Sequence, residues 1–173
     1  VAGRTPDRDT YMATKRRAEE LVCEEAGRIS RRSVRVEVNT ADRPEDDLFY
    51  LTATGTSAEQ GDDGQVGRGN RPNGLITPHR CMTLEAAAGK NPRNHVGKIY
   101  SIAAQQIASR LAATVPGVRN AQVYIVSQIG KPIDTEAVVD IQVVAEDMEA
   151  ARTEGECIAQ QVLAGLPNVW QGV

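Results

Sequence analysis

A glycine-rich segment, residues 55–98, carries most of the residue types that could bind or activate a charged ligand. Eight of the chain's 15 glycines and both of its histidines lie in it. Asp62 and Asp63 are followed at intervals by six basic residues: Arg68, Arg71, Arg80, Lys90, Arg93 and Lys98. Exposed backbone N–H groups and spaced cations together favour a phosphate chain. The segment therefore predicts a polyphosphate-binding site.

An alternative interpretation is a long mobile loop whose charges only keep it soluble. Structureless loops longer than about 12–15 residues are uncommon in compact domains unless they are functional or disordered. The segment lacks the runs of Ser, Pro and Glu typical of disorder, and apolar pairs such as Leu75–Ile76 alternate with its glycines. Composition alone leaves both interpretations open.

The elements that must position this segment are three helices and four strands. Apolar residues recur every three or four positions over residues 7–29, 96–114 and 148–164, which predicts helices. Alternation over residues 34–38, 48–54, 118–129 and 137–145 predicts two hairpins. The order favours an α+β fold with a mainly antiparallel four-stranded sheet and helices on one face. We divide the chain into residues 1–55, residues 56–98, which hold all but the first residue of the glycine-rich segment, and residues 99–173.

Bulk composition narrows the class of protein. The 173 residues are 40% hydrophobic but only 3% aromatic, so the core must be built from Val, Ile, Leu and Ala. A net charge of −3 argues against a binder of nucleic acid polymers or membrane surfaces, because both need a dominant basic face. The basic cluster is local, which suits a small anionic ligand.

The cysteines predict the cellular compartment of the protein, and the first residue indicates whether the sequence is a fragment. The three cysteines, Cys23, Cys81 and Cys157, lack metal-ligand spacing and predict free thiols in a reducing cytoplasm. The sequence contains no signal peptide and no apolar run of membrane-spanning length. Because the first residue is Val1 rather than Met, we expect a fragment or a processed product.

Two motifs give the segment a family resemblance. They are Gly61-Asp62-Asp63-Gly64-x-x-Gly67-Arg68 and Gly89-Lys90-Asn91-Pro92. Four further stretches match the sequences of the same family: residues 38–42, 54–59, 68–78 and 127–132. The chain resembles methionine adenosyltransferase (S-adenosylmethionine synthetase) of the archaeal-type branch. The resemblance implies the α+β domain that is repeated three times in those enzymes, and it makes this chain similar to their C-terminal part.

The resemblance also implies a reaction. In that family the methionine sulfur displaces the whole triphosphate of ATP from C5′, and the triphosphate is then hydrolysed to pyrophosphate and phosphate. The leaving group must be neutralised by Mg²⁺ and fixed cations, and K⁺ is a second implied cofactor. Arg68 and Lys90 match the family's catalytic basic residues, while Arg71 and Lys98 suit phosphate binding chemically.

Asp62 matches the family aspartate that holds the methionine amino group. A carboxylate among glycine N–H groups is well placed to bind an ammonium. Asp63 is a further candidate. Both also allow a structural interpretation, as an Asx-turn or a helix cap.

The stretch after the Gly-Lys motif departs from the bacterial branch, which carries a further lysine and a Mg²⁺-binding aspartate there. Residues 91–98 of this chain contain no carboxylate. Asn94 or His95 could orient phosphate or metal-bound water, and Lys98 could supply the second cation. A purely structural role for His95 at the start of a helix stays open, and the metal ligands stay unassigned.

The family's Gly-His-Pro-Asp motif, with a catalytic histidine and a metal-binding aspartate, does not occur in these residues. We therefore expect this piece to be inactive alone. The resemblance implies a homodimer with its site between subunits, and an apolar sheet face around Phe49, Tyr124 and Val126 would need such cover. Two further classes remain: a non-enzymatic nucleotide- or polyphosphate-binding module, and an anion-triggered regulatory domain.

Overall fold

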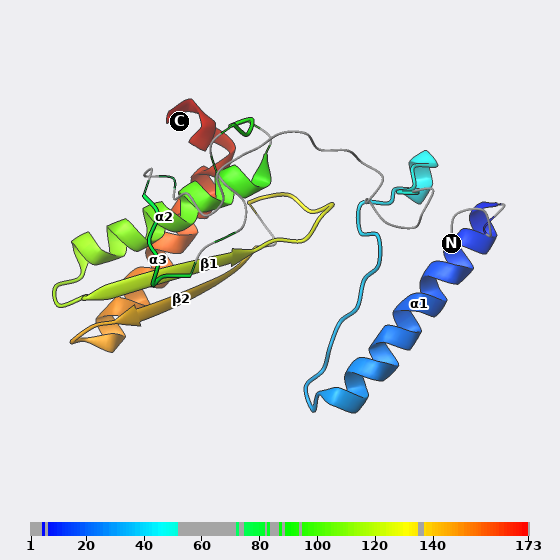
Figure 1. Cartoon of the computed structure of the whole chain (residues 1–173), viewed down its shortest axis with the longest axis horizontal. Helices are drawn as coiled ribbons and strands as arrows, with labels where there is room; N and C mark the ends of the chain where they lie inside the picture. The colour runs from blue at the N-terminus through cyan, green and yellow to red at the C-terminus, as the bar shows by residue number, and fades with distance from the viewer. Residues whose placement is uncertain are drawn as a thin grey trace. The chain divides into compact units, whose positions relative to one another are not determined.

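The structure is a computed structural model that describes residues 5, 7–51, 72, 75–81, 83, 87, 89–93, 95–134 and 137–172. The chain divides into two compact units, residues 1–63 and residues 64–173. The first contains helix α1 (Arg8–Ile29) and a short 3₁₀ helix, Pro44–Asp46. The second contains α2 (Val96–Thr114), β1 (Asn120–Val126), β2 (Val138–Val144), α3 (Met148–Gly165) and a final 3₁₀ helix, Leu166–Gly172 (Figure 1).

The second unit is a two-layer structure. Strands β1 and β2 pair antiparallel, with Val123 opposite Ile141. Helices α2 and α3 pack against each other and against one face of this sheet (Figure 1). Between the layers lie Ile107, Leu111 and Ile158, each 0% exposed. The α+β class and the antiparallel pairing are therefore confirmed.

Helix α2 follows directly from its sequence pattern. Ile99, Ala103, Ile107 and Leu111 are spaced by four residues and all are buried on the sheet side. The helix ends at Thr114, and Gly117 then takes a positive φ of +79°, which glycine adopts without strain. The predicted bounds for this helix agree with the structure.

Helix α3 begins at a conventional cap. The carboxylate of Asp147 accepts hydrogen bonds from the backbone N–H groups of Glu149 and Ala150 at 3.1 and 2.9 Å. The predicted helix at 148–164 is thereby confirmed. Strands β1 and β2 both lie inside the longer ranges predicted for them.

The outer face of this sheet differs from the expectation. Ala121, Val123 and Ile125 pack on the core, so the alternate residues of β1 point away from the helices. Across the pair, Gln122 lies opposite Gln142 and Tyr124 opposite Asp140. The predicted apolar outer face is therefore seen only at one end, where exposed Val126 lies opposite exposed Val138, because polar side chains occupy its centre.

In the first unit, α1 also matches its predicted range. Asp7 caps it by accepting a hydrogen bond from the Thr10 N–H at 2.7 Å, which lowers the pKa of Asp7. Tyr11 is the buried residue of α1, and its ring meets that of Phe49 edge to face at 5.1 Å between centroids. Phe49 therefore packs within this unit.

The predicted first hairpin does not form among the described residues. Residues 33–38 have no ladder hydrogen bonds, and the pairing seen nearby is the isolated bridge between Arg43 and Leu48. Side chains of α1 meet the backbone instead: Val38 N–H donates to Glu19 at 2.9 Å, and Cys23 donates to the carbonyl of Val34 at 3.7 Å. The predicted strand at 48–54 extends beyond the described residues, and the four-stranded sheet and the packing of α1 on it stay predictions.

Candidate functional site

The Gly-Lys motif leads directly into helix α2 through a side-chain-stabilised turn. The side-chain oxygen of Asn91 accepts a hydrogen bond from the Arg93 N–H at 2.8 Å, and its carbonyl accepts from the His95 N–H at 3.1 Å. The carbonyl of His95 then accepts from the N–H groups of Lys98 and Ile99 at 3.0 and 3.2 Å. This turn fixes the motif at the N-terminal end of α2.

Two of the predicted cationic residues meet there. The Lys98 ammonium donates to the backbone carbonyl of Lys90 at 3.3 Å. Gly89 precedes Lys90 with a φ of +77°, a conformation that L side chains rarely adopt. No acidic residue lies in the first turn of α2, and no side chain caps it. The N–H groups of the helix start and the two lysines therefore favour an anion.

His95 occupies the N-cap position of α2, but its side chain makes no capping hydrogen bond. Its Nδ1 atom is buried and has no hydrogen-bond partner among the residues that the structure describes. A buried polar atom without a partner destabilises the fold unless a ligand or water satisfies it. The His95 ring is therefore not a conventional helix cap, and its Nδ1 is available to a bound group.

The turn between β1 and β2 lies at this same end of α2 (Figure 1). The hydroxyl of Tyr100 donates to the carbonyl of Ile133 at 2.8 Å and also shares a hydrogen bond with Ser127. Burial raises the pKa of Tyr100, so its hydroxyl stays protonated at neutral pH. The sequence analysis did not identify Tyr100, because an apolar helix position gives no sign of what a hydroxyl contacts.

Arg80 and Cys81, two residues of the glycine-rich segment, form hydrogen bonds with β1. The guanidinium of Arg80 donates to the side-chain oxygen of Asn120. A hydrogen bond with the Cys81 thiol raises the pKa of Tyr124, whose hydroxyl also donates to Gln122 at 3.0 Å. Arg80 is thus bound to the sheet, whereas Lys90 and Lys98 lie at the start of α2.

The remaining predicted site residues lie outside the described residues. They are Asp62, Asp63, Arg68, Arg71 and Asn94. Of the predicted set, the structure brings Lys90, His95 and Lys98 together at the start of α2. Within the described ranges no three His, Cys, Asp or Glu side chains gather as metal ligands would. None of the helices described combines the length and apolar composition needed to cross a membrane.

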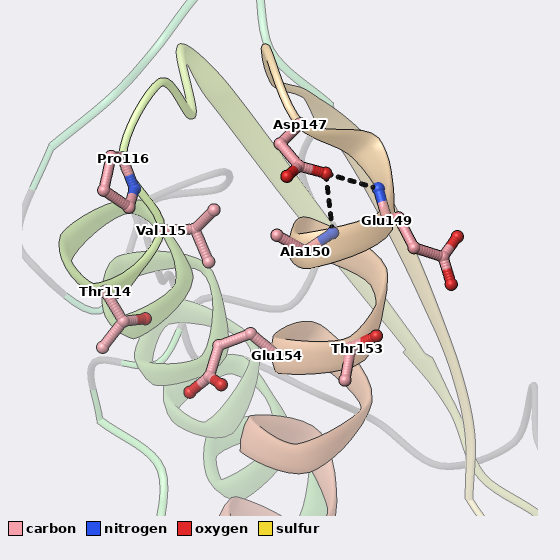
Figure 2. Close-up of a pocket in the computed structure, with 8 residues that line it drawn as sticks. All are labelled: Thr114, Val115, Pro116, Asp147, Glu149, Ala150, Thr153 and Glu154. Carbon is pink, nitrogen blue, oxygen red and sulfur yellow. Dashed lines mark hydrogen bonds between the residues drawn. The ribbon is translucent and has the colours of Figure 1, made fainter.

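A shallow hollow lies at the opposite end of α2, where that helix ends and α3 begins (Figure 2). Its lining includes Thr114, Pro116 and three acids, Asp147, Glu149 and Glu154. Asp147 is already engaged in capping α3, as the dashed lines in Figure 2 mark. The negative charge of this hollow disfavours a polyphosphate.

The first unit contains a buried polar cluster that the sequence analysis missed. The side chain of Asp42 is 1% exposed and accepts hydrogen bonds from the Tyr11 hydroxyl at 2.7 Å, the Lys15 ammonium at 3.0 Å and the Tyr50 N–H at 2.9 Å. Burial alone would raise the pKa of Asp42, but these hydrogen bonds and the charge of Lys15 hold it below its usual value. The Asn39 amide donates to the Tyr11 hydroxyl at 2.8 Å. The cluster ties α1 to the turn at 39–50.

Comparison with known proteins assigns the chain to a family. The family model described as S-adenosylmethionine synthetase (AdoMet synthetase) matches residues 1–173. A probable S-adenosylmethionine synthase of Aquifex aeolicus is 51% identical over 162 residues, and the S-adenosylmethionine synthase of Aeropyrum pernix is 53% identical over 161.

These matches cover 93% and 90% of this chain but 40% of each relative's length, so the chain spans about two fifths of the curated relatives. An S-adenosylmethionine synthase of Pyrococcus furiosus gives the same picture, at 51% identity over 92% of the chain and 40% of its own length. The expected resemblance is therefore confirmed along the whole sequence, and the chain belongs to the S-adenosylmethionine synthetase family.

Proposed function

We propose that this chain is part of an enzyme that makes S-adenosylmethionine from ATP and methionine, and that the start of α2 binds the triphosphate of ATP. One observation carries the second half of this proposal: the Lys98 ammonium holds the backbone of Lys90 at a helix N-terminus whose first turn contains no acid. Helix N–H groups and lysine ammoniums are the donors that phosphate oxygens prefer.

The chemistry needs charge stabilisation rather than a protein nucleophile. As the S–C5′ bond forms, the C5′–O bond breaks and its electron pair stays on the departing triphosphate. The negative charge on that leaving group grows through the transition state, so fixed cations beside it lower the barrier. Lys90 and Arg68 serve this step, and Arg71 and Lys98 hold the phosphate chain in place.

His95 is the third member of the group. Its buried Nδ1 has the capacity to donate to a phosphate oxygen or to accept from a bound water. We assign it to orienting the phosphates, together with Asn94. Asp62 binds the methionine ammonium, and Asp63 is its neighbour in the same motif.

Magnesium and potassium belong to the proposal through the family resemblance. Among the described residues, no three His, Cys, Asp or Glu side chains gather as a protein-held metal site would require. Mg²⁺ bound to the phosphates of ATP would neutralise part of the negative charge of the leaving group. We also propose a cytoplasmic homodimer with the site between subunits.

A binding module without catalysis is the second candidate function. The same cations would attract nucleotides or polyphosphate without any transfer to methionine. Formation of S-adenosylmethionine distinguishes the two functions, since only the enzyme makes it.

The test uses the full-length natural protein that contains this sequence. With ATP and methionine, we expect S-adenosylmethionine, pyrophosphate and phosphate. Arg68→Ala or Lys90→Ala should lower the chemical rate by roughly 10²–10³-fold, the usual effect of removing one such donor. Arg152→Ala is the control, because that guanidinium lies on α3 beside Glu156. Nucleotide binding without product would favour the binding module.

A further inference from the structure

We propose that Tyr100 is a positioning residue, which holds the β1–β2 turn against the start of α2 so that the turn completes the site formed by Lys90 and Lys98. This inference rests on the proposed function for the identity of the ligand. The attachment of the β1–β2 turn to α2 by Tyr100, which we call the clamp, rests on contacts within the second unit.

The ring of Tyr100 is fixed by packing. Tyr100 is 8% exposed and belongs to the core cluster between the helices and the sheet. Its hydroxyl reaches past that core to the far side of the turn, where the Ile133 carbonyl accepts it at 2.8 Å. The hydrogen bond with Ser127 attaches the same hydroxyl to the near side of the turn, just after the end of β1. One side chain of α2 thus holds both ends of the turn.

The turn between these two points is tight, and the side chain of Ile133 at its far end packs on the core cluster. Gly130 has a φ of +85°, and the Lys131 N–H donates to the carbonyl of Gln128 at 3.3 Å. Ile129, at the tip, is 77% exposed.

Tyr100 and Lys98 lie two residues apart on α2, and Lys98 is bonded to the Lys90 carbonyl. The first turns of α2 therefore hold the Gly-Lys motif through Lys98 and the β1–β2 turn through Tyr100. Loss of the Tyr100 hydroxyl should free the turn while leaving Lys90 and Lys98 in place. The expected defect is weaker binding of ATP with little change in the chemical rate, because ground-state contacts are lost.

Two variants of the full-length natural protein test this clamp. Tyr100→Phe keeps the buried ring and removes the hydroxyl. Ser101→Ala is the matched control, because its hydroxyl donates at 2.7 Å to the Gly97 carbonyl within α2 and does not touch the turn. Both are compared with the unmodified protein by amide hydrogen exchange over residues 127–134 and by steady-state kinetics.

We expect faster exchange of the turn in Tyr100→Phe alone, with the KM for ATP raised roughly three- to tenfold, as for the loss of one hydrogen bond, and kcat nearly unchanged. Unchanged exchange in the turn would overturn the clamp. Faster exchange with an unchanged KM would overturn its role in the site. An unmodified protein that makes no S-adenosylmethionine would contradict the proposed function instead, and the exchange measurement on the same samples would still decide the clamp.

Discussion

The ammonium of Lys98 lies 3.3 Å from the backbone carbonyl of Lys90 and donates a hydrogen bond to it. This bond joins the last motif of the glycine-rich segment to the first turn of α2. A lysine ammonium has three donors, so one bond to a carbonyl leaves capacity to bind an anion. Lys98 therefore both places Lys90 and adds its own charge to the same helix start.

Replacement of Gly89 should disturb this arrangement from the backbone side. At a φ of +77°, Gly89→Ala meets no described neighbour within 4 Å, so we assign its cost to the left-handed conformation. That cost is roughly 1–2 kcal/mol for an L residue. We expect lower thermal stability and weaker binding of tripolyphosphate, measured by thermal unfolding and by calorimetry.

The matched control is Gly27→Ala. Gly27 lies inside α1, also with no atom within 4 Å of an added Cβ. Alanine there should stabilise the protein by about 1 kcal/mol, because it favours the helix. Equal effects of the two substitutions would show that the conformation of Gly89 does not matter.

Asp62 should act on methionine rather than on ATP. Asp62→Asn keeps the shape of the side chain but removes the charge that pairs with the amino group. We expect the KM for methionine to rise roughly ten- to hundredfold, as for a hydrogen bond to a charged group, with the KM for ATP much less affected. If methionine affinity is unchanged and ATP binding is lost, Asp62 lies at the metal instead.

The sequence predicted the second unit well because its signals are local. Ile99, Ala103, Ile107 and Leu111 repeat at helical spacing and are buried in α2, and glycines mark the turns at Gly117 and Gly130. The first predicted hairpin is not seen among the described residues. The alternation of Val34, Val36 and Val38 is that of a strand, yet α1 side chains meet backbone groups of this segment. The alternation of side chains does not show whether the backbone groups of a segment form hydrogen bonds with another strand or with side chains of a helix.

The site residues that belong to a sequence motif could be predicted. Residues that act through partners far away along the chain could not be predicted. Lys90, His95 and Lys98 were identified from a motif and its following stretch. Tyr100 and Asp42 were missed, because their partners Ile133 and Tyr11 lie 33 and 31 residues away along the chain. Such pairs form only once the helices have packed.

The buried Asp42 cluster predicts a pH-dependent stability. Because the folded-state pKa of Asp42 is lowered, its contribution is complete above the usual value of about 3.9 and is lost as pH falls through the folded value. Asp42→Asn should therefore destabilise the protein by about 1–3 kcal/mol at neutral pH. The difference from the unmodified protein should shrink below about pH 4, as measured by thermal unfolding across pH.

Asp46→Asn is the control for this comparison. Asp46 lies in the same unit and pairs with Arg43 at 3.7 Å on the surface, where an ion pair contributes about 0–1 kcal/mol. A destabilisation by Asp42→Asn that stays constant or grows as pH falls would contradict the assigned protonation state of Asp42.

Titration of this chain with tripolyphosphate, followed by calorimetry at low and high salt, tests the central claim that its basic segment binds a polyphosphate. We predict weak binding at low salt that decreases as salt rises, because solvent ions screen the exposed cations. Lys90→Ala should weaken it further, while Arg152→Ala should not. No binding at low salt, or binding that Lys90→Ala leaves intact, would contradict the site at the start of α2.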